Sequence, residues 1–187
     1  MPDTETLECI LLSEMSRRNT DLVVDLISQK PGLFDEIFRI FLRNEEPVSR
    51  RAAWVIDIIS EKEPELLLPH IERIVEMLPL FSHDGLKRHS LRMLLRSPLP
   101  RDEHLGTLMN ICFDWLLSPN EAVAAKVHCM DILYSISQIE PDLKKELADS
   151  IEWRLREETP GYKNKGEKLL KKLYVEIELL KVKRKVF

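Results

Sequence analysis

Glycine, cysteine and aromatic residues are all scarce in this chain. Its 187 residues include 5 glycines and 3 cysteines, and aromatic residues make up 6% of the total. The low glycine content and the lack of alternating Val, Thr and Tyr runs argue against a β-sheet protein. Cys9, Cys112 and Cys129 are odd in number and far apart, a pattern that indicates neither a disulfide framework nor a zinc knuckle. We therefore expect buried thiols.

Long hydrophobic runs are missing as well. No apolar stretch reaches the roughly 20 residues that a membrane-spanning helix needs. The segment Met1-Pro2-Asp3-Thr4-Glu5 is acidic and lacks the basic start of a signal peptide. These features predict a cytoplasmic protein that has no membrane partner.

Residues for catalysis or metal binding do not cluster in the sequence. The glycines form no phosphate-binding loop, and His83, His89 and His104 have no cysteine or carboxylate at the spacing of a metal site. No nucleophile or acid–base pair stands out either. The sequence thus predicts a protein that is not an enzyme and uses no cofactor, and it indicates no small-molecule substrate.

The residues that are abundant favour an all-α fold. Hydrophobic residues make up 44% of the sequence and charged residues 32%, which is ordinary for a folded soluble protein. Leu, Ile, Glu, Lys and Arg dominate the periodic segments, and these residue types favour helices.

One six-residue pattern occurs three times. It reads Val-Val-Asp-Leu-Ile-Ser at 23–28, Val-Ile-Asp-Ile-Ile-Ser at 55–60 and Cys-Met-Asp-Ile-Leu-Tyr at 129–134. Internal repetition changes what is expected of each residue in the repeat. Because an aspartate recurs at the same position, we expect a scaffold role rather than a catalytic one for Asp25, Asp57 and Asp131.

A second marker, an apolar residue followed three positions later by a basic one, gives the repeat length. It falls at Val48, Leu86, Val123 and Tyr162, in steps of 38, 37 and 39 residues. Two-helix solenoid repeats have a period of roughly 40 residues, and turn or capping residues precede each marker. The predicted helix pairs are 4–15 with 19–29, 33–43 with 47–61, 66–80 with 85–97, 104–117 with 121–138, and 143–157 with 161–181.

Three large residues recur in the first helices of successive pairs. Met77, Trp115 and Trp153 follow one another at steps of 38. Since isolated helix pairs cannot bury their apolar stripes, neighbouring pairs must stack. We interpret these three residues as interlocking core between adjacent repeats.

Three segments are similar to HEAT repeats: Leu67-Leu68-Pro69-His70-Ile71, Asp84-Gly85-Leu86-Lys87-Arg88, and residues 45–53, Glu-Glu-Pro-Val-Ser-Arg-Arg-Ala-Ala. In that family the first helix often carries a proline near its start, and the second opens with an acidic residue, a valine and an arginine. The resemblance implies a right-handed superhelix of about five helical hairpins whose second helices line the concave surface. It makes 1–181 a single repeat domain and 182–187 a basic C-terminal tail.

Charge is distributed unevenly between the predicted first and second helices of the pairs. The whole chain carries a net charge of −4, yet the predicted second helices at 85–97 and 161–173 are strongly basic. A basic inner face toward the C-terminal half would attract acidic protein segments or a phosphate backbone. Structural pairing inside the repeats is the competing interpretation. The candidate partner-binding residues are Arg50, Trp54, Lys87, Arg88, Arg92, Lys126, Lys163 and Lys168.

Three functions are compatible with this pattern. The leading hypothesis is a non-enzymatic scaffold that grips a protein partner along its concave face. A nucleic-acid-binding solenoid is the alternative. Trp54 and Asp57 beside Arg50 also look superficially similar to HEAT-like DNA glycosylases, but Trp115 and Trp153 are expected on outer helices, away from any such site.

Overall fold

The computed structural model describes the backbone of residues 4–186 and the side chains of residues 6–182. Ten α-helices packed in pairs make up this described part, which contains no strand. The predicted all-α class is confirmed. The helices are α1 (Thr4–Ser13), α2 (Arg17–Gln29), α3 (Phe34–Leu42), α4 (Val48–Lys62), α5 (Ile71–Met77), α6 (Asp84–Arg96), α7 (Asp102–Leu117), α8 (Val123–Ile139), α9 (Leu143–Leu155) and α10 (Pro160–Val186).

The third hairpin departs most from the predicted helix bounds. Instead of a helix over 66–80, α5 has 7 residues. Short 3-10 segments flank it, and Pro64, Pro69 and Pro79 each stand at the start of one. Proline lacks the backbone N–H that an α-helix requires and clashes with the preceding turn, so these residues divide the predicted helix.

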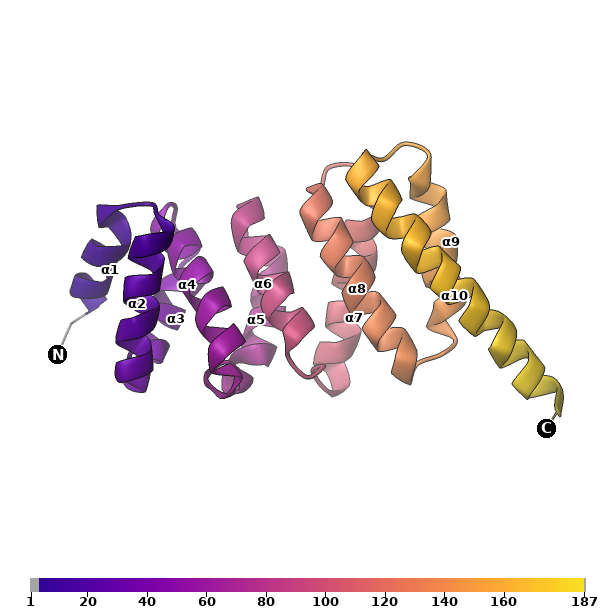
Figure 1. Ribbon diagram of the computed structural model, residues 1–187, viewed down its shortest axis with the longest axis horizontal. Helices are drawn as coiled ribbons and strands as arrows, with labels where there is room; N and C mark the ends of the chain where they lie inside the picture. Colours follow the sequence, from indigo (N-terminus) through magenta and orange to yellow (C-terminus); the bar gives the residue numbers. More distant parts are fainter. Residues whose placement is uncertain (1–3, 187) are drawn as a thin grey trace. The chain divides into compact units, whose positions relative to one another are not determined.

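The chain divides into two compact units, one ending at His104 and the other beginning at Leu105. In the first unit, Figure 1 shows α2, α4 and α6 side by side on one face, with α3 and α5 behind them. Helix α4 is central because it packs against α2, α3 and α6. Its Ala52, Ala53 and Ile56 are fully buried, and the two small alanines allow close helix packing.

In the second unit, α8 and α10 lie in front of α7 and α9 (Figure 1). Helix α10 packs against both α8 and α9. Gly166 makes the closest approach to α9, since a Cβ there would lie 3.0 Å from Ile151 Cγ2 and 3.1 Å from Leu155 Cδ1. The close packing of α10 on α9 therefore requires a residue without a side chain at position 166.

A leucine at position 166 should separate α10 from α9. We expect Gly166→Leu to lower the free energy of unfolding by about 1–3 kcal/mol, because overpacking forces neighbouring side chains and backbone to shift. Gly106→Leu is the matched control, since no atom lies within 4 Å of a Cβ at that helical position. Urea unfolding monitored by circular dichroism measures both. Equal stability of the two variants would contradict the packing argument.

Two expectations about buried residues need correction. Cys112 and Cys129 are buried, but Cys9 is exposed. Met77 and Trp115 are 8% and 9% exposed, as core residues should be, whereas Trp153 is 69% exposed.

The spacing between equivalent helices explains why Trp153 is exposed. Buried residues of α9 follow buried residues of α7 by 39 positions, not 38: Leu147 follows Leu108, Ile151 follows Cys112, and Arg154 follows Trp115. Arg154 therefore occupies the position equivalent to Trp115. Adjacent helical residues are about 100° apart, so Trp153 lies outside the buried stripe.

Candidate functional site

The aspartate of the repeated pattern binds the next second helix in the first unit. Asp57 of α4 has a 1% exposed side chain, and His89 of α6 donates from Nδ1 to its Oδ2 over 2.7 Å. Arg96 donates to its Oδ1 and, over 2.7 Å, to its backbone carbonyl. Arg92 Nη1 lies 3.4 Å from Oδ2. Both carboxylate oxygens of Asp57 are thus engaged in helix packing.

This hydrogen-bond network also determines where His89 carries its proton and whether Asp57 is ionised. A carboxylate only accepts hydrogen bonds, so His89 Nδ1 must carry a proton, and Nε2 can accept from Arg88 Nη2 at 3.3 Å. Burial alone would raise the pKa of Asp57, but the hydrogen bonds from His89 and Arg96 outweigh it and hold this pKa below its ordinary value. A buried, ionised and fully bonded Asp57 does not present the carboxylate that a glycosylase-like site would require.

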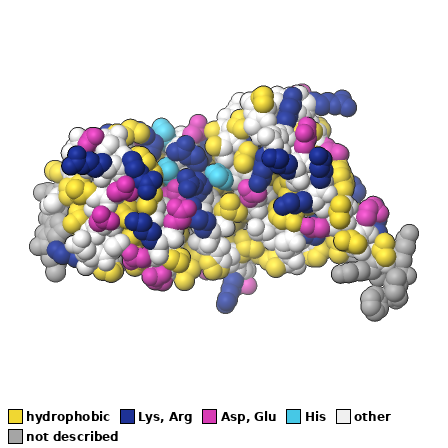
Figure 2. Space-filling model, in the orientation of Figure 1, with side chains coloured by type: hydrophobic (Ala, Val, Ile, Leu, Met, Phe, Trp, Pro, Cys, Tyr) yellow, Lys and Arg dark blue, Asp and Glu magenta, His cyan; other side chains and the backbone are white. Residues whose placement is uncertain are grey.

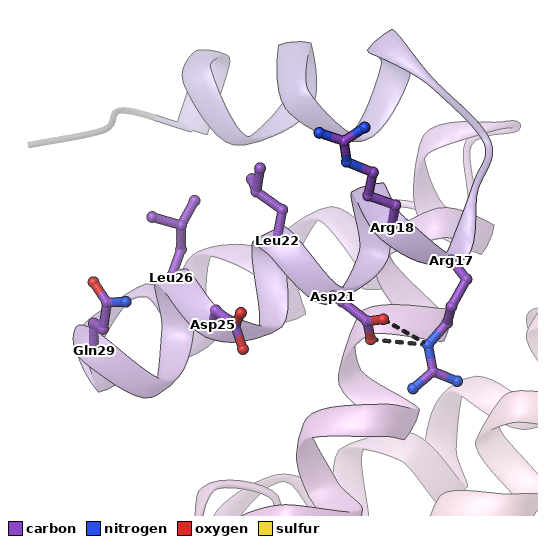
Figure 3. A pocket seen from close by; sticks show the side chains of 7 residues that line it. All are labelled: Arg17, Arg18, Asp21, Leu22, Asp25, Leu26 and Gln29. Carbon is purple, nitrogen blue, oxygen red and sulfur yellow. Dashed lines mark hydrogen bonds and ion pairs between the residues drawn. The ribbon is translucent and has the colours of Figure 1, made fainter.

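The other two pattern aspartates have different surroundings. Asp131 of α8 forms an ion pair with Lys165 of α10, again joining successive second helices. Asp25 of α2 is exposed and lines a shallow hollow of about 700 Å³ whose lining residues all come from α2 (Figure 3). There Arg17 Nε donates to both oxygens of Asp21, over 2.8 and 3.0 Å. The expected scaffold role therefore holds for Asp57 and Asp131, while Asp25 lies on the surface.

Lys126, one of the expected partner-binding residues, is buried. Its side chain is 2% exposed, and its ammonium donates to Glu158 Oε1 over 2.5 Å. Arg154 Nη2 donates to the same oxygen over 2.8 Å. Burial alone would raise the pKa of Glu158, but the hydrogen bonds from Lys126 and Arg154 lower it by more. The pKa of Glu158 therefore lies below its ordinary value. We call Lys126, Arg154 and Glu158 the buried triad; it leaves no Lys126 charge for a partner.

Expected partner-binding residues of the first unit also contact the protein itself. Arg50 Nε donates to Glu46 over 2.9 Å, and its aliphatic part packs so closely on Gly85 that a Cβ there would lie 2.7 Å from Arg50 Cδ. Trp54 and Lys87 are half-buried. Arg88 is exposed beside His89, and the side chain of Arg92, 40% exposed, pairs with Asp57. Structural pairing thus accounts for part of the basic character of α4 and α6.

Helix α10 presents a different surface. Lys163 is half-buried near its start, and Lys168 is exposed. Lys168 begins a single stripe at helical spacing that is basic in its first half and apolar in its second. Figure 2 shows basic and hydrophobic side chains next to one another on the face that carries α8 and α10. The members of this α10 stripe are Lys168, Lys171, Lys172, Val175, Leu179 and Val182.

The apolar half of the α10 stripe is unusually exposed. Val175, Leu179 and Val182 are 61%, 57% and 59% exposed, whereas large aliphatic side chains are mostly buried in soluble proteins. The opposite side of the helix packs into the core through Leu173, which is fully buried. Beside the stripe, Glu176 accepts hydrogen bonds of 2.6 Å from both Tyr134 and Lys144. The stripe is therefore held in place and turned away from the core.

The apolar half of the α10 stripe and the hydrogen bonds of Glu176 were not predicted from the sequence. The detectable signal is a spacing: His89 follows Asp57, Glu158 follows Lys126, and Glu176 follows Lys144, each by 32 residues. Two of these pairs, Asp57 with His89 and Lys126 with Glu158, join neighbouring hairpins, and the third joins the two helices of the last hairpin. Searching for such pairs identifies Lys126 as a structural residue.

The described residues show neither a metal-binding cluster nor a membrane-spanning helix. Within that part of the chain, no three His, Cys, Asp or Glu residues are grouped closely enough to hold a metal ion. No helix there combines the length and the apolar character needed to cross a membrane.

Comparison with known proteins gives one match. Residues 7–173 match the family described as HEAT repeat domain. Neither the curated proteins nor the solved structures gave a match to this chain. The match contains α2 to α9 completely, α1 from Leu7 onward, and α10 as far as Leu173.

Proposed function

Because this chain belongs to the HEAT repeat domain family, we propose that it is a non-enzymatic scaffold that binds a protein partner on the face formed by its second helices. The family has an α-solenoid architecture, which offers extended surfaces to partners rather than an enclosed catalytic pocket. The single observation that carries the proposal is the α10 stripe, an exposed surface on a second helix that is basic in its first half and apolar in its second.

The composition of the α10 stripe defines the partner class. Its apolar half needs an apolar counterpart, because Val175, Leu179 and Val182 are spaced as anchors for an amphipathic helix. Its basic half contains three lysines and no acidic residue, so it favours carboxylates. An amphipathic helix whose apolar face continues into an acidic segment satisfies both halves.

A phosphate backbone would use only half of this surface. Lysines attract nucleic acid, but three aliphatic side chains in line offer neither hydrogen bonds nor stacking to bases. The protein partner therefore accounts for more of the stripe than nucleic acid does.

Affinity purification with charge and anchor variants tests the proposal. Lys168→Glu combined with Lys171→Glu, and separately Leu179→Glu, should each abolish recovery of partners that wild type retains. Lys181→Glu is the matched control, because Lys181 is a 61% exposed lysine of the same helix outside the stripe.

Two results of this experiment would contradict the proposed protein-binding role of the α10 stripe. Recovery of the same partners by the stripe variants would show that the α10 stripe is not the binding face. Loss of recovery after nuclease treatment, with binding to DNA or RNA that falls steeply as salt rises, would replace the protein partner with nucleic acid.

A further inference from the structure

The second unit also contains a groove to which no residue of the α10 stripe contributes. It is a groove of about 430 Å³ at the end of α8, where the chain turns into α9 and passes beside the start of α7. Pockets that hold ligands or anchoring side chains have volumes of about 300–1,000 Å³. The groove is lined by Leu105, Gly106, Met109, Ile136, Glu140, Asp142, Leu143 and Glu146.

The groove combines an apolar floor with a rim of one charge. Leu105 and Met109 of α7, Ile136 of α8 and Leu143 of α9 supply the floor, and Gly106 widens it, since a Cβ there would meet nothing within 4 Å. All three ionisable residues of the lining are acidic, and Glu140 and Glu146 are exposed.

We propose that this groove binds a peptide segment in which a large apolar anchor is flanked by lysine or arginine. The apolar floor takes the anchor, because burying apolar surface is the main favourable term in such contacts. The carboxylates of Glu140 and Glu146 select basic flanking residues and repel acidic ones. Charge complementarity thus separates this site from the α10 stripe, whose lysines select the opposite charge.

Fluorescence anisotropy with matched probes measures the binding directly. The probe is a labelled synthetic peptide, Lys-Arg-Leu-Phe-Lys-Arg, used with the full chain. One control peptide replaces the basic residues with glutamate, and another replaces Leu-Phe with Ser-Ser. We expect saturable binding of the first peptide and none of the two controls at the same concentrations.

Variants of the groove locate the binding. Glu140→Lys combined with Glu146→Lys should weaken binding by about tenfold or more through loss of the charge match. Gly106→Leu should weaken it by filling the groove while the protein stays folded, because position 106 faces open space. Lys168→Glu on the α10 stripe should leave probe binding unchanged, so failure here and failure of the proposed function are distinguishable.

Three outcomes would overturn the proposal: no binding of the basic probe by the wild type, equal affinity of the wild type and the Gly106→Leu variant, or equal binding of the acidic and basic probes. Light scattering is run on the same samples. A dimer that dissociates in the Glu140→Lys and Glu146→Lys variant would also overturn it, since a second copy of the chain would then cover the groove.

Discussion

Replacing Asp57 by alanine is expected to lower the free energy of unfolding by about 3 kcal/mol, because it leaves buried donors without an acceptor. His89, with a 6% exposed side chain, would lose the carboxylate that it contacts over 2.7 Å. Arg96 would lose its side-chain acceptor and keep the Asp57 backbone carbonyl. The measurement is urea unfolding followed by circular dichroism at neutral pH.

The repeated pattern supplies two matched controls for Asp57→Ala. Asp25→Ala removes an exposed carboxylate at the equivalent position and should change stability by less than about 0.5 kcal/mol. Asp131→Ala breaks a pair whose side chains are 28% and 33% exposed, so its cost should be about 1 kcal/mol or less. Similar losses in all three variants would contradict the conclusion that burial and partners, rather than the pattern itself, decide the role of the aspartate.

The sequence also contains the reason for this difference. His89 lies 32 residues after Asp57, and Lys165 lies 34 residues after Asp131. The residue 32 positions after Asp25 is Asp57 itself, which carries the same charge, and the residue 34 positions after it is Ile59. The pattern aspartate therefore joins two second helices only where the next second helix offers a base.

Local signals predicted the helices well, because amphipathic periodicity and capping residues act within a few turns. The limits of α2, α4 and α8 fall within two residues of their predicted ends. The prediction for α5 was wrong because its helical periodicity was given more weight than its prolines. Trp153 was misplaced because a shift of one residue between repeats rotates a side chain by about 100°, out of the core.

The candidate site was harder to predict, because the role of a charge depends on which residue faces it across the repeat. Lys126 and Lys168 were both predicted to bind a partner, yet one is 2% exposed and bonded to Glu158 while the other is exposed. The apolar half of the α10 stripe was missed because a Val/Leu spacing on a helix normally indicates core.

The buried triad gives the second large effect. We expect Glu158→Ala to lower the free energy of unfolding by about 3–5 kcal/mol, because Lys126 would remain buried as an uncompensated charge and Arg154 would keep only its pair with the exposed Glu157. The side chains of Lys126 and Arg154 are 2% and 9% exposed, so water cannot replace the lost carboxylate. Glu157→Ala is the matched control: it removes the neighbouring glutamate, which is 77% exposed, and should cost less than about 1 kcal/mol. Comparable losses in the two variants would refute the triad as a stabilising element.

Acid titration tests the same carboxylate by a different route. The pKa of Glu158 in the folded protein lies below the ordinary value of 4.5, so the unfolded chain binds its proton more readily. Stability from this group is therefore complete above pH 4.5 and is lost as pH falls through the folded-state pKa. Glu158→Gln removes the titrating group, so its unfolding free energy should fall less steeply than that of the wild type below pH 4.5. Parallel acid dependence of the two proteins would show that Glu158 is not held ionised by Lys126 and Arg154.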